Sequence, residues 1–344
     1  MPLTKVQSRG TENVGQGSSN VIINGAMNIA QRSTSETNRG DDTGYYVVDR
    51  WKLSTGASTA GRLTLSQDSS APSGFANSTK FDCTTADTSI ASGEFLQFEQ
   101  LIEGQNLQAF AKGTADAKPF AVSFYVKGNA SATYVCELFD ADNSRQISKT
   151  FNVTTDWTRV ELTFPADTTG AFDDDNASSL ALVIHLNAGS NYTSGTINSG
   201  SWASSTNANR VGSGTTSFFD STDRTFFITG VQLEVGSQAS DFQHEDIGTT
   251  LQKCQRYYQE IELSTTFRQV GTQEYADFFP FHAVMRASPT ASVVTQFKYW
   301  DGGIPTNFTP GFVTLIGGSS IVAPNLSTSG NGFQAGKASF SSEL

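Results

Sequence analysis

The feature that most constrains this chain is a two-residue alternation of apolar and polar side chains in its central part. It is clearest in Phe120–Lys127, and it recurs at residues 160–164, 180–186 and 227–235. Such alternation is typical of a strand with one buried and one solvated face, and the Gly, Asn, Asp and Ser clusters between these stretches indicate turns. Two antiparallel sheets packed face to face would bury all four stretches, so the sequence predicts a β-sandwich. Strands and helical patterns do not alternate regularly, which disfavours a doubly wound α/β fold.

Composition supports an all-β chain and excludes some classes of function. The 344 residues include 25 Phe but only 3 Met, and 16% are charged, whereas helix-rich proteins carry more Lys, Glu, Leu and Met. The 22 basic and 33 acidic residues give a net charge of -11. Because no basic stripe replaces the counterions of a phosphate backbone, we expect no nucleic-acid partner. We also expect neither a signal peptide nor membrane insertion, since the apolar runs are too short for either.

The patterns divide the chain into four parts. Residues 1–20 are polar and Gly-rich, which is typical of an arm that orders on a partner, although a frayed terminus is an equal alternative. Residues 21–245 contain the alternating stretches of the sandwich. Residues 246–261 show the apolar stripe of one amphipathic helix. Residues 262–344 contain strand-like runs broken by Pro and Gly, and they predict a smaller C-terminal β-rich domain.

A long connection, Asn187–Phe218, is the segment most informative about function. Connections longer than about 12–15 residues inside a compact domain are usually functional or disordered, and this one contains Tyr192, Trp202 and Arg210. Aromatic rings stack on the apolar faces of sugars while polar side chains pair with the hydroxyl groups. These three residues and Trp300 are therefore candidates for glycan contact. For Trp202, local packing or a subunit contact is the alternative, and it is the commoner role for such a residue.

The sequence offers little for catalysis or for a cofactor. It lacks a Gly-x-Ser-x-Gly motif, and spacing alone cannot place a pair of catalytic carboxylates, so we expect no enzyme and assign no catalytic residue. Asp173 and Asp175 lie in an oxygen-rich loop and are weak calcium candidates, with a solvated turn as the alternative. The three cysteines are too far apart for a disulfide framework or a zinc site, and we expect buried thiols.

Four segments resemble tail-fibre and related virion proteins of tailed bacteriophages, especially marine and cyanobacterial phages. In chain order these segments are Ile22–Arg32, Asp49–Trp51, Phe226–Gly236 and Cys254–Tyr258. The resemblance covers roughly residues 20–259, and the rest more loosely. It implies that a strand with Asn-Gly opens a jelly-roll sandwich similar to carbohydrate-binding modules. It also implies that a Leu-Glu-x-Gly strand closes the sandwich and that the Cys-Gln-Arg-Tyr-Tyr helix leads to a variable C-terminal β domain.

The resemblance also implies a virion structural or adhesion protein rather than an enzyme. The arm is short and lacks coiled-coil heptads, which favours a short tail fibre or spike. We expect residues 1–20 to attach to other virion proteins, the chain to form a homotrimer, and the assembly to bind host-surface glycan or protein by avidity. A purely structural capsid, neck or collar decoration is the alternative, and a polysaccharide depolymerase is less favoured. Tyr257 lies outside the helix stripe and is expected to pack on the C-terminal domain or on a neighbouring subunit.

Overall fold

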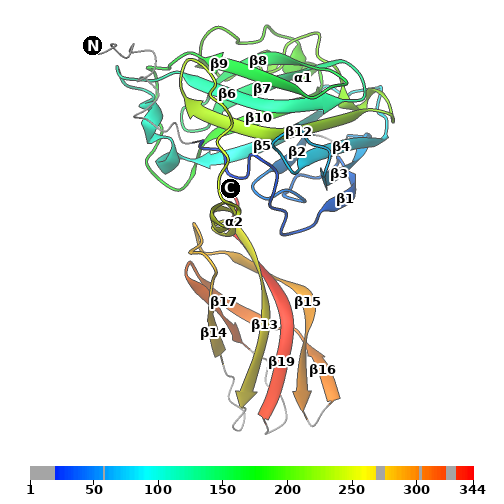
Figure 1. Ribbon diagram of the computed structural model, residues 1–344, viewed down its shortest axis with the longest axis vertical. Helices are drawn as coiled ribbons and strands as arrows, with labels where there is room; N and C mark the ends of the chain where they lie inside the picture. The colour runs from blue at the N-terminus through cyan, green and yellow to red at the C-terminus, as the bar shows by residue number, and fades with distance from the viewer. Residues whose placement is uncertain (1–19, 57–58, 269–275, 302–303, 323–330) are drawn as a thin grey trace, which may run out of the picture.

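The described part of the chain consists almost entirely of strands, so the prediction of an all-β fold is confirmed. A computed structural model describes residues 20–56, 59–268, 276–301, 304–322 and 331–344. Within these ranges the strands form two separate domains, and helix α2 (Ile247–Gln255) lies between them (Figure 1).

The first domain is a jelly-roll β-sandwich of two six-stranded antiparallel sheets. Its strands are β1 (Ser35–Arg39), β2 (Lys52–Gly56), β3 (Arg62–Asp68), β4 (Ser78–Thr85), β5 (Phe95–Glu103), β6 (Phe120–Gly128), β7 (Ala132–Asp140), β8 (Arg145–Val153), β9 (Thr158–Phe164), β10 (Ser178–Ala188), β11 (Ala203–Ser204) and β12 (Thr225–Val235). Sheet A has the order β1-β3-β4-β12-β6-β9, and sheet B has the order β11-β8-β7-β10-β5-β2. The short helical turns are η2 (Gly104–Asn106), η3 (Gln108–Phe110), α1 (Ser190–Thr193), η4 (Asn207–Asn209) and η5 (Phe218–Asp220).

The core lies between the two sheets and is rich in aromatic rings. Every second residue from Phe120 to Val126 is fully buried, as the alternation predicts. Trp51 is also buried and stacks on Phe98 with 4.8 Å between ring centres. The three cysteines are free and buried, which confirms that expectation.

The Asn24–Gly25 segment does not open the sandwich as a strand, because residues 23–26 form a turn and the first strand begins at Ser35. Asn24 has a positive φ of 59°, a conformation that Asn tolerates better than most residues. A Cβ at Gly25 would lie 2.0 Å from the carbonyl oxygen of Val231, so only glycine allows this approach. The turn is thereby held against β12, where the N–H of Val231 donates to the carbonyl of Gly25 at 2.9 Å.

The helix predicted for residues 246–261 is shorter than expected. α2 begins after Asp246, whose carboxylate accepts from the N–H groups of Gly248 and Thr249, and it ends at Gln255. The next strand, β13, already begins at Tyr258. The predicted end is wrong because residues 258–261 pair with strand β19 instead of continuing the helical stripe.

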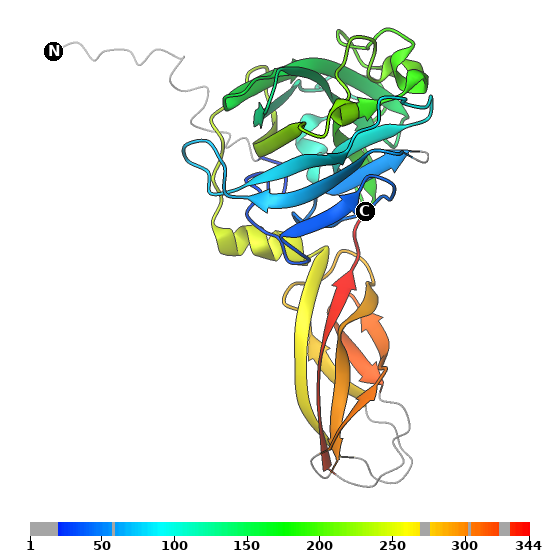
Figure 2. The ribbon, with the colours of Figure 1, turned by 90° about the vertical axis from the view of Figure 1, so that its right-hand side faces the viewer.

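The second domain is a smaller β structure that projects from the sandwich (Figure 2). Its strands are β13 (Tyr258–Arg268), β14 (Ala276–Pro280), β15 (Thr290–Asp301), β16 (Ile304–Phe308), β17 (Gly311–Leu315), β18 (Gly318–Val322) and β19 (Asn331–Ser341). They form one four-stranded sheet, β13-β19-β15-β16, and one three-stranded sheet, β14-β18-β17. The last strand, β19, brings the chain back towards the sandwich, so residues Ser342–Leu344 lie between the two domains.

Candidate functional site

Three of the four segments that resemble phage virion proteins contact one another at the lower edge of the sandwich. Asn24 in the first segment donates through Nδ2 to the carbonyl of Asp49 in the second, at 3.1 Å. The indole N–H of Trp51 donates to the carbonyl of Asn24 at 3.3 Å. The turn at Asn24 also joins the third segment through the Gly25–Val231 contact. Segments that are more than 200 positions apart in the sequence therefore form one local structure.

The fourth segment meets this structure at the joint, which we define as Arg32, Arg50, Tyr257, Tyr258 and Glu343. The guanidinium carbon of Arg50 lies 3.5 Å from the centre of the Tyr257 ring, and that of Arg32 lies 3.6 Å from the Tyr258 ring. Glu343 pairs with both arginines, at 3.0 Å to Arg32 and in a short contact to Arg50. Each arginine is therefore held by a ring and a carboxylate together, an arrangement suited to its flat, weakly hydrated cation.

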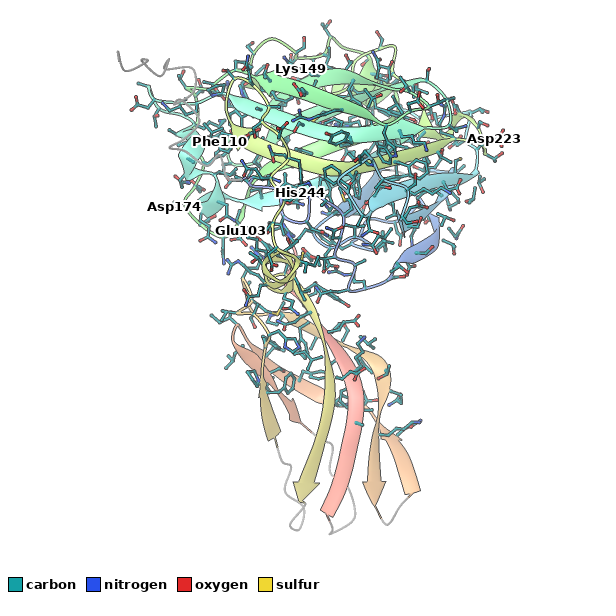
Figure 3. All side chains as sticks on the ribbon, in the orientation of Figure 1. Glu103, Phe110, Lys149, Asp174, Asp223 and His244 are labelled. Carbon is teal, nitrogen blue, oxygen red and sulfur yellow. The ribbon has the colours of Figure 1, made fainter. Side chains whose placement is uncertain are left out.

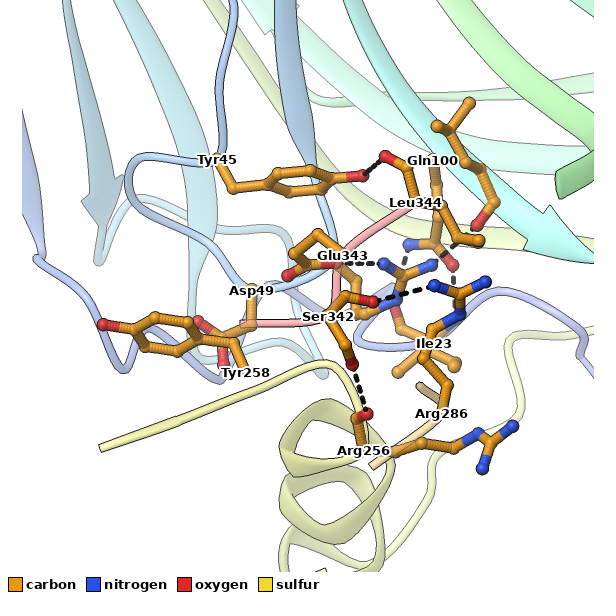
Figure 4. A network of polar contacts seen from close by, with 12 residues as sticks. Ile23, Tyr45, Asp49, Gln100, Arg256, Tyr258, Arg286, Ser342, Glu343 and Leu344 are labelled. Atoms are coloured by element: carbon orange, nitrogen blue, oxygen red, sulfur yellow. Dashed lines mark hydrogen bonds and ion pairs between the residues drawn. The ribbon is translucent and has the colours of Figure 1, made fainter. Parts of the chain in front are cut away.

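A second layer of polar contacts surrounds the joint (Figure 4). Arg286 in the second domain donates to the carbonyl of Ser342 at 3.1 Å, and the carboxylate of Glu103 pairs with Arg256 at 3.0 Å. Burial alone would raise the pKa of Glu103, but hydrogen bonds from Arg256 and Tyr257 outweigh it and lower that pKa. Glu103 thus remains a carboxylate on the sandwich face that meets α2, where Figure 3 shows it.

The structure places the ring of Tyr257 against Arg50 of the sandwich, a partner that the sequence did not suggest. The residue is 1% exposed, so its ring is not available to a neighbouring subunit, and its carbonyl accepts from the N–H of Ser342 at 2.8 Å. The helical stripe suggested a free ring because the helix was expected to continue. Since the chain leaves the helix at Gln255, both tyrosines turn inward.

The long connection Asn187–Phe218 does not display Trp202 to solvent. Trp202 is 7% exposed and belongs to the main core, with its ring centre 5.4 Å from that of Phe120. Its indole N–H donates to the carbonyl of Pro165 at 2.9 Å. A buried ring with its only donor already used cannot stack on a sugar, so the glycan role predicted for Trp202 is corrected to packing.

The other two candidates of the connection hold it onto sheet B. Arg210 pairs with the fully buried carboxylate of Glu137 at 2.7 Å, and His185 contacts the same carboxylate at 2.7 Å. Burial would raise the pKa of Glu137, but the hydrogen bond from His185 and the charge of Arg210 lower it. Tyr192 is half-buried and meets Phe95 edge to face at 5.4 Å. The connection therefore covers the outer face of sheet B near these contacts.

The remaining predicted residues lie in β15 and in the loop between β9 and β10. Trp300 lies in β15, and its side chain is outside the described residues. Asp173 and Asp175 are exposed, and the carboxylate of Asp175 accepts from the N–H of Ala177 at 2.8 Å, as in an ordinary turn. Their role as calcium ligands stays a prediction. Within the described ranges, no group of three or more His, Cys, Asp or Glu side chains is arranged to hold a metal.

An oxygen cage near these loops is filled by a lysine. The ammonium of Lys112 has no exposed surface and lies 2.5 Å from the carboxylate of Asp140 and 3.2 Å from that of Asp167. It also donates to the carbonyls of Gly170 at 2.7 Å and Thr169 at 2.9 Å. Two carboxylates and two carbonyls are ligands that a hard cation prefers. In this chain the cation is the side chain itself, which ties β7 to the loop after β9.

Beside the joint, the structure contains an open cavity of about 250 Å³. It lies between the Asn24–Gly25 turn and the segment that leads into α2. The lining side chains are mostly polar, and they comprise Asn20, Ile22, Asn24, Ala26, Asn28, Phe242, Gln243, His244, Glu245, Thr250 and Lys253, together with Gly25. Figure 3 shows His244 on the segment that connects the sandwich to α2.

One wall of this cavity is aromatic. The rings of Phe242 and His244 lie 4.9 Å apart, and both pack against Phe75, at 4.9 Å and 5.0 Å. Phe75 in turn covers Gly230, where a Cβ would come within 2.7 Å of the ring. No sequence pattern indicates this wall, because Phe75 and Phe242 are 167 positions apart and neither lies in a pattern that predicts contact.

Comparison with known proteins gives no family assignment. No family model matches the chain, and no curated protein matches it. Within the described residues, no helix has the length and apolar character needed to cross a membrane.

Among solved structures, the sandwich is similar to proteins of low sequence identity. The enzymatically active domain of tailspike protein 4 from bacteriophage CBA120 is 14% identical with a TM-score of 0.34, and the match covers 63% of this chain and 21% of that chain. TmCBM61 in complex with β-1,4-galactotriose is 11% identical with a TM-score of 0.34, covering 64% and 100%. A family 11 carbohydrate-binding module from Clostridium thermocellum is 12% identical with a TM-score of 0.29, covering 62% and 99%. This chain spans about a fifth of the tailspike chain. At these identities and TM-scores, the similarity assigns neither a ligand nor an activity to this chain.

Replacing Glu343 by Gln should destabilise the protein, because Arg50 is 1% exposed and would lose its counter-charge. Removing one partner of a buried ion pair costs about 3–5 kcal/mol, and we expect a loss near the lower end because Gln keeps one hydrogen bond. Denaturant unfolding measures the change. Glu161→Gln is the matched control, since the Glu161 side chain in its pair with Arg159 is 50% exposed. Equal stability of the two variants would contradict the role of Glu343.

Replacing Lys112 by Met should leave the carboxylates of Asp140 and Asp167 without their shared cation. We expect a loss of about 3–5 kcal/mol in the free energy of unfolding. Lys118→Met, at an exposed position of the same segment, should change stability little. If thermal unfolding of the Lys112 variant resembles that of the control, the cage does not support the fold.

Proposed function

We propose that this protein is a virion structural protein of a tailed bacteriophage, a short tail fibre or spike that binds glycan or receptor on the host surface. The observation that supports this most is that the four phage-like segments contact one another. The first three meet at the Asn24–Gly25 turn, and the fourth meets the first two at the joint. Segments that share only a sequence resemblance would be expected to scatter over a fold. Here they make the structure that fixes a distal β domain to a sandwich.

The shape of the molecule is consistent with this proposal. The two domains lie end to end, with α2 and the joint between them (Figure 1). Such an arrangement holds one domain away from the other, as a fibre or spike requires. The proposed binding is non-catalytic, and the polar cavity with its aromatic wall is the described surface that best suits a glycan.

Copies of the chain are proposed to associate as a homotrimer. Large apolar side chains that are exposed on the distal domain support the association, because removing their surface from water is favourable. They are Val284, Val293, Val294, Val313, Leu315 and Ile316, each at least 40% exposed. Burial against neighbouring copies would cover them, and three weak glycan sites on one assembly would act together by avidity.

Two other functions are alternatives for a protein of a phage particle. A purely structural decoration of the capsid, neck or collar would have the same joint and no receptor. A polysaccharide depolymerase would need a pair of positioned carboxylates, and the lining of the cavity contributes one, Glu245.

The purified chain should bind host-cell surface polysaccharide and leave its length unchanged. Co-sedimentation with host cells measures the binding, and a reducing-sugar assay measures cleavage. Absence of binding would favour the structural decoration, and release of reducing ends would favour the depolymerase.

Removing residues 1–19 should abolish incorporation into phage particles and leave the fold intact. Asn20 must be kept, because its side-chain oxygen accepts from the N–H groups of Ile22 and Leu233 at 3.0 Å each. Incorporation is measured by protein detection in purified particles, and the fold by thermal unfolding. Truncated chains that enter particles at the normal level would refute the proposed attachment.

A further inference from the structure

We infer that the cavity beside the joint binds one neutral pyranose residue of a glycan, with the sugar ring against Phe242. This inference rests on the proposed function and adds to it the site and the class of sugar. None of the candidates predicted from the sequence lines this cavity, which lies between the Asn24–Gly25 turn and the start of α2.

The aromatic wall is held in position before any ligand arrives. Phe242 packs on Phe75 and His244, and its Cε2 lies 3.4 Å from the position that a Cβ of Gly25 would take. The ring is therefore fixed against the turn instead of turning freely in solvent. A fixed aromatic face stacks on the apolar C–H face of a pyranose at little conformational cost.

The polar groups of the cavity suit hydroxyl groups. The side-chain oxygen of Asn28 accepts from Asn77 at 3.1 Å, and the structure gives its amide N–H groups no acceptor among the described residues. The ammonium of Lys253 contacts the carboxylate of Glu245, which also accepts from Thr250 at 3.1 Å. Donors and acceptors thus lie side by side, as a ring of vicinal hydroxyls requires.

Charge balance identifies the class of sugar. Lys253 and Glu245 neutralise each other, and their side chains are 46% and 34% exposed. An anionic sugar would be attracted by Lys253 and repelled by Glu245, so the pair gives it no net electrostatic stabilisation. A neutral sugar would meet a donor and an acceptor. The structure therefore favours a neutral hexose over a uronate or a sulfated residue.

The size of the cavity limits how much of a glycan it holds. Pockets for drug-sized ligands have volumes of about 300–1,000 Å³, and this cavity has about 250 Å³. One sugar residue fits, and the rest of the glycan would extend into solvent. Affinity at one such site is expected to be weak.

Saturation-transfer NMR on the full chain tests the inference. The probes are the methyl glycosides of glucose, galactose, mannose and N-acetylglucosamine, with methyl glucuronide as the anionic probe. We expect transfer to at least one neutral glycoside and none to the glucuronide. Phe242→Ala should weaken the binding at least tenfold, and Asn28→Ala should weaken it several-fold without removing a packed ring.

Trp157→Ala is the matched control, because Trp157 is a half-buried aromatic that packs with Phe227 at 6.1 Å and does not line the cavity. It should leave glycoside binding unchanged. Undiminished binding in both the Phe242 and the Asn28 variants would overturn the inference, and so would stronger transfer to the glucuronide.

The same samples separate failure of the inference from failure of the proposed function. If the wild type binds host polysaccharide but no neutral glycoside, the inference is overturned and the proposed function stands. If the wild type binds neither, both are overturned. Thermal unfolding of each variant shows whether it is folded, and the Asn28 variant decides the question if the Phe242 variant is not.

Discussion

The contact of Glu343 with Arg50 and Arg32 is the interaction on which the two-domain structure depends. A buried guanidinium is costly unless a carboxylate and further partners compensate its lost hydration. Arg50 obtains this compensation from three distant parts of the chain. Glu343 pairs with it from the segment after β19, and Tyr257 packs on it from the segment after α2. The carbonyl of Leu101 in β5 accepts a hydrogen bond from it at 2.6 Å. The sandwich, the segment after α2 and the end of β19 must therefore be in place together, and this couples the two domains.

Other buried charges serve the sandwich itself. Glu137 holds the long connection through Arg210, and Lys112 holds the loop after β9 through Asp140 and Asp167. These ion pairs use polar residues that a sequence would otherwise suggest for ligand binding. The pair of Glu137 and Arg210 closes part of the outer face of sheet B. The polar cavity that remains open lies at the edge beside the joint, where the turn and the segment before α2 face each other.

The sequence predicted those features that local periodicity encodes. Alternation from Phe120 to Val126 gave the correct buried face, because a strand places every second side chain inward. Periodicity could not show whether the long connection folds towards the core, so glycan contact and local packing both stayed open for Trp202. The helix end was wrong because pairing with β19 overrides the helical stripe after Gln255. Glu343 and Phe242 were missed because long-range contacts leave no local pattern.

The most direct test of the joint is the distance distribution between the two domains in solution. Spin labels at Asp223→Cys in the sandwich and Lys298→Cys in β15 would report it, since both positions are exposed and the three native cysteines are buried. Pulsed electron paramagnetic resonance should give one narrow distance distribution for the wild-type joint, and adding Glu343→Gln should broaden this distribution. A broad distribution with Glu343 intact would contradict the claim that this carboxylate fixes the domains to each other.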